Sequence, residues 1–326
     1  MTNISSKSDS QRIYKIYNFL EKYGTLLAIL LICIIFSFLT HIFIQIDNIL
    51  SILVQSSAIG IVSMGLTLVM ITGNLDLSFG SIIGLSGMTT AFLLSVEYSS
   101  FTSIIVGLCI GIIFGFINGI LVVKIRIESL VATIATQAII FGLAYFYSGG
   151  VDIHSGRNKF FKFISEGSIG AIPMPVILLL IILFIGIFVT QFTAIGRYFY
   201  AIGGNPIAAK FSGIRISYYK IIAYIISGFL ASISGILMLS RLGYGAAYTG
   251  QGYLLDGFAA VFVGLTILKS GKPNMTGSVV GAMFMSILNN GFQLLNINFV
   301  IQILLKGIAL LSIVIVYSKL SAKKNI

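Results

Sequence analysis

Residues 71–87 read ITGNLDLSFGSIIGLSG and place a carboxylate, Asp76, in a glycine-rich break. Apolar residues fill the stretches on both sides of the break, over 49–72 and 78–96. A helix needs roughly 20 apolar residues to cross the hydrocarbon core of a bilayer, and both stretches have about that length. The break therefore predicts two membrane-like helices joined by a polar turn that contains an acid.

The composition of the whole chain supports a membrane protein. Of its 326 residues, 57% are hydrophobic and 9% are charged, and the mean hydropathy is +1.06. A soluble domain of this length needs far more charge to cover its surface. The net charge of +11 is spread over short segments between apolar stretches, which does not indicate a nucleic-acid-binding face. The sequence predicts an all-α polytopic membrane protein.

Ten apolar stretches are long enough to be helices that cross the membrane. They cover residues 24–44, 49–72, 78–96, 101–123, 129–148, 174–190, 217–240, 254–268, 275–295 and 298–317. The third, eighth and ninth are short or rich in glycine, so the predicted number of spans is eight to ten. This predicts a transmembrane domain over 24–317, with tails over 1–23 and 318–326.

Basic residues indicate how the chain is oriented in the membrane. Ten spans with the N-terminus inside place fifteen of the twenty lysines and arginines on the cytoplasmic side and one, Lys306, within a span. The outer segments hold the remaining four, Arg157, Lys159, Lys162 and Arg241. An excess of basic residues on the cytoplasmic side is the usual rule for such proteins. Both tails are therefore predicted to be cytoplasmic.

The chain contains no recognisable catalytic or ATP-binding motif. Gly271-Lys272 is followed by Pro273, and the GxxxxGK[ST] phosphate loop is missing from the sequence. The two cysteines, Cys33 and Cys109, lie in apolar runs without metal-ligand spacing. We therefore expect a transport subunit that is not an enzyme and binds no metal or cofactor. Asp76 and Asp256 are the two acids close to a span, too few to favour an ion-coupled carrier.

A long polar segment over 191–216 contains a predicted docking helix. Asn205 suits the N-cap of a short helix, Pro206 its first residue, and Gly213 its end. Small residues give one face on which another protein can pack closely; the alternative is a helix that rests on the membrane surface. The predicted docking residues are Gly203, Gly204, Asn205, Pro206, Ala208, Ala209, Ser212 and Gly213.

Four stretches resemble the permease subunits of bacterial ribose-type sugar ABC importers. GRYFYAIGGNPIAAKFSGI, residues 196–214, resembles their cytoplasmic coupling segment, which is expected over residues 197–216 here. TGNLDLSFGSIIGLSG resembles their Gly-Ile-Asp-Leu-Ser-x-Gly-Ser signature, and GQGYLLDGFAAVFVG and GSVVGAMFMSILNNGFQLL resemble two C-terminal signatures. The order and spacing match over roughly residues 50–315. The chain is identified as a member of this family.

The resemblance implies a permease dimer, formed by two copies or by a copy and a paralogue, in the bacterial plasma (inner) membrane. It also implies a cytoplasmic ATPase subunit that uses ATP and Mg, an extracytoplasmic binding protein, and a ribose-like pentose or hexose as the solute. A nucleoside or a furanosyl signalling molecule is the alternative solute within this class. An ion-coupled secondary transporter is the alternative class.

The chain departs from the family pattern near Asp256. The family usually has an acid at the position of Leu254, and a stretch rich in glycine and serine where this chain has Leu265, Ile267, Lys269, Ser270 and Pro273. Fewer glycines mean fewer close approaches between backbones and a stiffer loop. These departures leave the particular solute and the pairing with a second copy open.

Neutral amides and hydroxyls are the predicted lining of the solute path, because a sugar needs both donors and acceptors. The predicted path residues are Asn118, Thr136, Gln137, Asn289, Asn290 and Gln293, with Thr133 a further candidate. The alternative is hydrogen bonding between helices, worth about 0.6 kcal/mol each in a membrane.

The acids in the two glycine-rich breaks are predicted to have a structural role. Asp76 and Ser78 would cap the helix that begins at about Ser78, where a carboxylate meets the positive end of the helix dipole. Asp256 is interpreted in the same way. Contact with the solute, as part of a gate, is one alternative, and coupling to the ATPase through the cytoplasmic side is the other.

Overall fold

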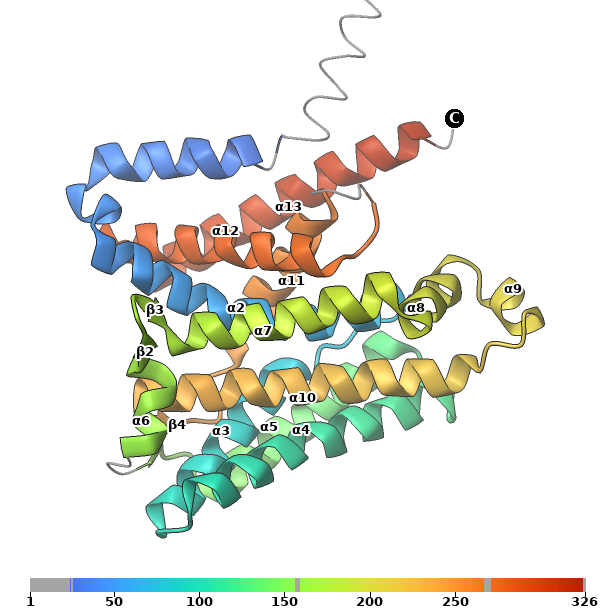
Figure 1. The fold of residues 1–326 in the computed structure, drawn as a ribbon, viewed down its shortest axis with the longest axis horizontal. Coiled ribbons are helices and arrows are strands. Elements are labelled where there is room, and N and C mark those ends of the chain that lie inside the picture. Colours follow the sequence, from blue (N-terminus) through green and yellow to red (C-terminus); the bar gives the residue numbers. More distant parts are fainter. Residues whose placement is uncertain (1–23, 25, 156–158, 267–270, 325–326) are drawn as a thin grey trace, which may run out of the picture.

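The computed structural model describes residue 24 and residues 26–155, 159–266 and 271–324, and is mostly helical over these ranges (Figure 1). The N-terminal helix covers Leu26–Leu39 and a 3-10 turn His41–Ile44. The helices that follow are α2 (Ile46–Ile71), α3 (Phe79–Ser95), α4 (Ser100–Val123), α5 (Ser129–Ser148), α6 (Lys159–Glu166), α7 (Met174–Ile187, continued by a π-helical turn Phe188–Phe192), α8 (Ala194–Gly204), α9 (Pro206–Phe211), α10 (Ile216–Leu242), α11 (Gln251–Leu265), α12 (Met275–Leu294) and α13 (Phe299–Lys324). Four two-residue strands, β1 (Ile153–His154), β2 (Ser168–Ile169), β3 (Ile172–Pro173) and β4 (Tyr244–Gly245), complete the described elements.

Each of the ten predicted apolar stretches coincides with a helix. Among the described residues, five helices are long and apolar enough to cross a membrane: Ile46–Ile71, Ser100–Val123, Ser129–Ser148, Met174–Phe192 and Ile216–Leu242. The predicted class, an all-α polytopic membrane protein, is confirmed. The polar segments add three short helices, α6, α8 and α9. The predicted tail 1–23 lies outside the described residues.

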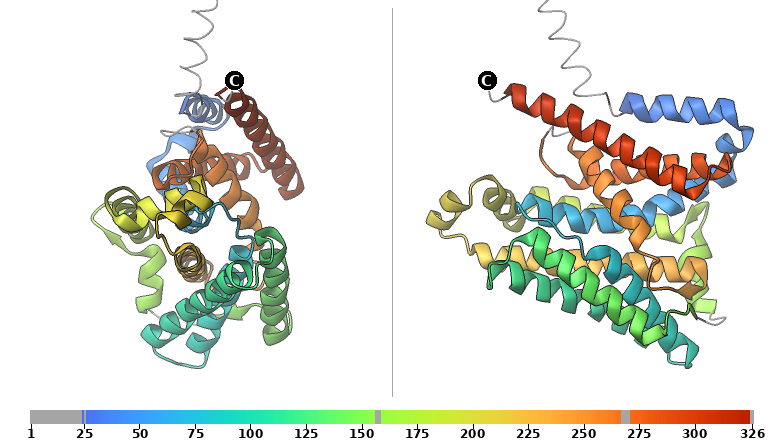
Figure 2. Two further views of the ribbon diagram at one scale, coloured as in Figure 1. Left: turned by 90° about the vertical axis from the view of Figure 1, so that its right-hand side faces the viewer. Right: turned by 180° about the vertical axis from the view of Figure 1, so that it is seen from behind.

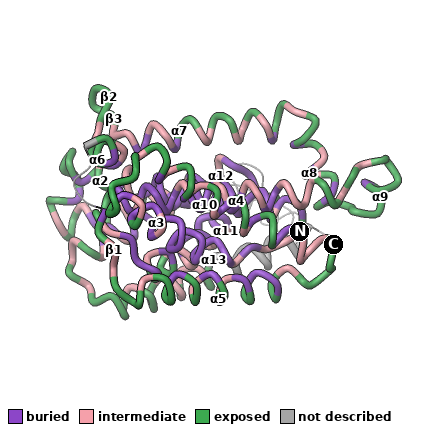
Figure 3. The backbone as a smooth tube through the Cα atoms, turned by 90° about the horizontal axis from the view of Figure 1, so that it is seen from below, coloured by how far each residue is buried: buried purple, intermediate pink, exposed green. Residues whose placement is uncertain are grey.

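Helix α2 forms the centre of the molecule. It packs against α7, α10, α11 and α12, and its residues from Ser56 to Val69 are buried on all sides. A helix that is apolar all round is stable in this position because other helices cover every face. Figure 3 shows buried residues along the middle of the molecule, whereas α5 and α7 expose much of their surface.

Helices α4 and α10 approach each other through glycine. The α4 glycines Gly107, Gly111, Gly115 and Gly119 are four residues apart and are buried. A Cβ atom on Gly111 would collide with the carbonyl oxygen of Gly228 on α10. Small residues at this spacing let the backbones of membrane helices pack closely. Any larger residue at position 111 would separate the two helices.

Two irregular segments enter the helical bundle. Residues 72–78 connect α2 to α3, and residues 246–250 connect β4 to α11. A Cβ atom on Gly80, in the first turn of α3, would meet the carbonyl oxygen of Gly250, so the second segment is in close contact with the start of α3. Irregular backbone within a membrane protein is tolerated where protein surrounds it. The break around Asp76 is one of these two segments.

The polar segments gather at opposite ends of the bundle. Helices α8 and α9 lie at one end together with the α4–α5 connection and the end of α13 (Figures 1 and 2). Helix α6 and the four strands lie at the other end (Figure 1). There β1 pairs antiparallel with β4, Ile153 opposite Gly245, and β2 pairs with β3.

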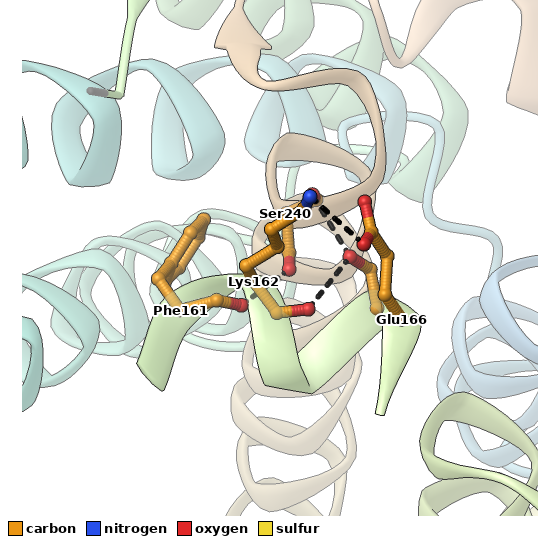
Figure 4. Close-up of polar contacts among 5 residues, drawn as sticks. Phe161, Lys162, Glu166 and Ser240 are labelled. Carbon is orange, nitrogen blue, oxygen red and sulfur yellow. Dashed lines mark hydrogen bonds and ion pairs between the residues drawn. The ribbon is translucent and has the colours of Figure 1, made fainter. Parts of the chain in front are cut away.

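Two hydrogen bonds in opposite directions hold helix α6 against the end of α10. Ser165 Oγ donates to the Ser240 carbonyl (2.9 Å), and Ser240 Oγ donates to the Phe161 carbonyl (2.6 Å). Figure 4 shows these residues together with the exposed ion pair between Lys162 and Glu166 (3.1 Å). The bonds fix the position of α6 against the bundle.

Candidate functional site

Asp76 is fully buried and is held by three hydrogen-bond donors. Its Oδ1 atom accepts from the Ser78 amide (2.9 Å) and the Ser78 hydroxyl (2.7 Å). Its Oδ2 atom accepts from the Ser227 hydroxyl on α10 (2.8 Å). Ser78 immediately precedes the first residue of α3, so the carboxylate shapes the turn into that helix and ties it to α10.

The Asp76 network continues into two more helices. Asn118 of α4 donates from Nδ2 to Ser78 Oγ (2.7 Å), and Thr136 of α5 donates to Asn118 Oδ1 (2.7 Å). The sequence predicted Asn118 and Thr136 as path residues and Asp76 and Ser78 as a cap. The structure brings these two predicted groups together in one buried chain of hydrogen bonds.

Asp256 forms a second buried cluster at the contact of three helices. Its carboxylate on α11 pairs with Lys306 Nζ on α13 (3.1 Å to Oδ1) and accepts from Asn289 Nδ2 on α12 (2.8 Å to Oδ2). The side chains of Lys306 and Asp256 are 11% and 6% exposed. Asp256 lies within α11 rather than ahead of it, so the prediction that it caps a helix in the manner of Asp76 is wrong.

The other predicted amides have different surroundings. Asn290 and Asn48 exchange two hydrogen bonds (2.8 and 3.0 Å) that join α12 to α2. Gln293 is exposed, and Gln137 is half-buried. Successive residues of a helix point about 100° apart, so Asn289 and Asn290 face different neighbours. Both amides form hydrogen bonds to other helices. This agrees with the alternative prediction for these residues, hydrogen bonding between helices.

The predicted docking helix forms where the sequence places it. Asn205 Oδ1 accepts the Ala208 amide (3.0 Å), and Pro206 is the first helical residue. Helix α9 ends at Phe211, and Gly213 adopts a left-handed conformation with φ of 78°. The N-cap and the end of this helix are therefore confirmed.

The exposed face of α9 differs from the predicted one. Ala209 is 4% exposed, whereas Ile207 and Phe211 are 71% and 88% exposed. Residues four apart lie on one face of a helix, and the residue midway between them lies on the opposite face. Ala209 was predicted to be on the docking face and faces its own chain, so this part of the prediction is wrong. Ala208, Gly204, Ser212 and Gly213 are exposed.

The end of α8 packs on the end of α2 without any intervening side chain. A Cβ atom on Gly203 would collide with the Ile71 carbonyl oxygen and would approach the Gly73 amide. Gly73 itself has φ of 81°, the left-handed region that favours glycine. The α8–α9 segment therefore touches the residues that lead directly into the Asp76 turn.

Several residues of these clusters carried no local signal in the sequence. Ser227 binds Asp76, and Ser129 accepts the amide of Leu75 in the same turn. Both are small hydroxyl residues in or beside apolar stretches, and such residues usually bond to their own helix. Lys306 did carry a signal, because a lysine inside a predicted span calls for an acidic partner. The described residues contain no group of three His, Cys, Asp or Glu side chains that could hold a metal ion.

Comparisons with known proteins cover almost the whole chain. Residues 48–316 match the family described as branched-chain amino acid transport system / permease component. The chain is 34% identical to the ribose import permease protein RbsC of Haemophilus influenzae, over 95% of this chain and 97% of the relative. It is 35% identical to RbsC of Bacillus subtilis, over 93% and 94%, and 32% identical to the D-allose transport system permease protein AlsC of Escherichia coli, over 94% of each. No solved structure matches the chain. This length of similarity shows that the chain belongs to the ribose-type ABC permeases, within the family of membrane permease components that its residues 48–316 match.

Proposed function

We propose that the chain is the membrane subunit of an ATP-binding cassette importer that carries a monosaccharide delivered by an extracytoplasmic binding protein. The observation that carries this proposal is the near full-length similarity to relatives named for ribose and D-allose. The family description names branched-chain amino acids instead. The buried charges help to choose between the two classes of solute.

The buried acids of the described residues favour a neutral solute. An amino acid carries a carboxylate and an ammonium group, and both need charged or strongly polar partners when they leave water. Asp256 is already paired with Lys306, and Asp76 is bound by Ser78 and Ser227. Both acids are also buried, at 0% and 4% exposed, so neither is open to an incoming ammonium group. A pentose or hexose carries no charge and makes no such demand.

The proposed orientation has ten membrane crossings and both termini in the cytoplasm. Basic residues support it, because Lys124, Arg126, Arg197, Lys210 and Arg215 fall in the segments that lie at the α9 end of the bundle (Figure 1). An excess of positive charge marks the cytoplasmic side. Helix α6 and the strands then face the binding protein.

Helices α8 and α9 are proposed as the contact with the ATPase subunit. They extend from the bundle at the proposed cytoplasmic end (Figure 2), and α9 exposes Ile207 and Phe211. Large exposed apolar side chains on a helix fit an apolar groove in a partner protein. ATP hydrolysis is assigned to that partner, and the permease supplies the path.

A second permease copy is proposed as the other half of the path. One pocket among the described residues lies between α2, α6, α7, α10 and α11 and has a volume of about 20 Å³. This pocket holds little more than one water molecule and is too small for a monosaccharide. In the proposed dimer the path lies between the two chains, and the exposed faces of α5 and α13 are available for that contact.

Reconstituted transport tests the proposed function. The permease is inserted into proteoliposomes with its ATPase subunit and its binding protein, and uptake of radiolabelled ribose, allose, adenosine and leucine is compared. We expect ATP-dependent uptake of ribose or allose. Uptake of leucine alone would contradict the assignment of the solute, and uptake driven by a proton gradient without the ATPase would contradict the class.

A further inference from the structure

The contact between α8 and α2 allows movement to pass from one to the other. Phe199 and Ile202 of α8 are fully buried, and Gly203 lies against the Ile71 carbonyl with no room for a side chain. Packed protein is nearly incompressible, so such a contact is not absorbed by flexible side chains. A displacement of α8 therefore moves the backbone at the end of α2.

The next residues along the chain are held by two other helices. Leu75 donates its amide to Ser129 Oγ at the start of α5 (3.2 Å). Its carbonyl oxygen accepts from the Tyr224 hydroxyl of α10 (2.9 Å). Tyr224 also belongs to the same apolar cluster as Phe199 and Ile71. The turn 72–78 is thus connected on one side to α8 and on the other to α5 and α10.

Asp76 connects the turn to α10 at a second point. Ser227, which binds Asp76, lies one helical turn after Tyr224, so both residues reach the turn from the same face of α10. The ion pairs found among the described residues are Lys162–Glu166 and Lys306–Asp256, and neither includes Asp76. Neutral donors alone hold this buried carboxylate, and such bonds to a charged group are stronger than ordinary ones.

We propose that Asp76 is a positioning residue that couples the ATPase-docking segment to the transmembrane helices. In this mechanism α8 moves the turn 72–78, and the carboxylate carries the movement to α10 through Ser227 and to α4 through Ser78 and Asn118. The proposal rests on the proposed function, because it requires an ATPase that acts on α8 and α9. It assigns to Asp76 a role beyond shaping the start of α3.

Two matched substitutions on α10 test the coupling. Ser227→Ala removes the bond to Asp76, whereas Ser234→Ala removes a bond from the same helix to the Ala58 carbonyl of α2 (3.0 Å), away from the turn. Both serines are fully buried. The complete importer is studied in lipid nanodiscs, with basal ATPase, ATPase stimulated by the sugar-loaded binding protein, transport and thermal stability measured on each variant.

We expect Ser227→Ala to lower both stimulated ATPase and transport by roughly ten- to a hundredfold, the range for one lost hydrogen bond to a charged group. Basal ATPase should match that of Ser234→Ala. Equal behaviour of the two variants would overturn the proposal. A Ser227→Ala variant that loses transport but keeps full stimulation of the ATPase would also overturn it, because this result indicates a contact with the solute. The same holds if Ser227→Ala loses all activities equally and has a lower Tm than Ser234→Ala, because this result indicates a purely structural role.

Hydrogen exchange provides a second test that needs no substitution. We expect the amides of residues 72–78 in the wild-type importer to exchange at different rates in the nucleotide-free and ATP-trapped states. Identical rates would overturn the proposal. Stimulation of the wild-type ATPase by a sugar-loaded binding protein tests the proposed function itself, so a failure there is distinct from a failure of the coupling mechanism.

Discussion

The buried ion pair between Asp256 and Lys306 gives the sharpest prediction about stability. Replacing Lys306 with methionine keeps an unbranched side chain of similar length on α13 and removes the charge. Asp256 would keep its bond to Asn289 Nδ2 and lose its cationic partner. The carboxylate would then be almost completely buried without a compensating charge.

The expected loss is large because the pair is out of water. Breaking a buried ion pair by removing one partner costs about 3–5 kcal/mol, most of it for the charge left behind. The double variant Asp256→Asn/Lys306→Met removes both charges and leaves an amide oxygen that still accepts from Asn289. Replacing both partners is often neutral or stabilising, so we expect the double variant to lie within about 1 kcal/mol of the wild type.

Unfolding of the purified permease by SDS in mixed micelles measures both values. We expect the single variant to be about 3 kcal/mol less stable than the double variant. A Lys306→Met variant that loses less than about 1 kcal/mol would refute the reasoning. A double variant as unstable as the single one would show that α13 packs poorly for reasons other than charge.

Three further predictions concern topology, docking and the amides. In a cysteine-free background, Ser168→Cys should react with a membrane-impermeant thiol reagent in intact cells and Lys210→Cys should not; the reverse labelling would exclude the proposed orientation. Phe211→Ala should weaken binding of the ATPase subunit roughly thirtyfold, because a central apolar anchor is worth about 2 kcal/mol, and Lys210→Ala serves as the neighbouring control; equal affinities would exclude docking through the exposed face of α9. Asn290→Ala should lower the Tm because it leaves the buried amide of Asn48 without its partner. Gln293→Leu should leave the Tm unchanged and slow transport if the exposed amide of Gln293 lines the path. An unchanged transport rate would remove Gln293 from the path.

The amino-acid sequence by itself determined the class of protein and the positions of its main helices. In a bilayer, the polar groups of the backbone must be hydrogen-bonded within the protein, and a helix satisfies them within its own segment. An apolar run of sufficient length therefore predicts a helix from local sequence alone. The cap at Asn205 and the first helical residue Pro206 were predictable for the same reason, since a cap joins atoms three residues apart.

The tertiary structure alone decided which polar groups meet. Asp76 and Ser227 are separated by 151 positions, and Asp256 and Lys306 by 50, yet each pair lies within hydrogen-bonding distance. Such contacts depend on how the helices cross, and glycine positions such as Gly111 and Gly228 set those crossings through close backbone contact. The exposed face of α9 was decided in the same way, because the neighbouring helices bury Ala209 and leave Phe211 outside. Hydropathy shows that a helix forms, and only packing decides which of its sides stays free.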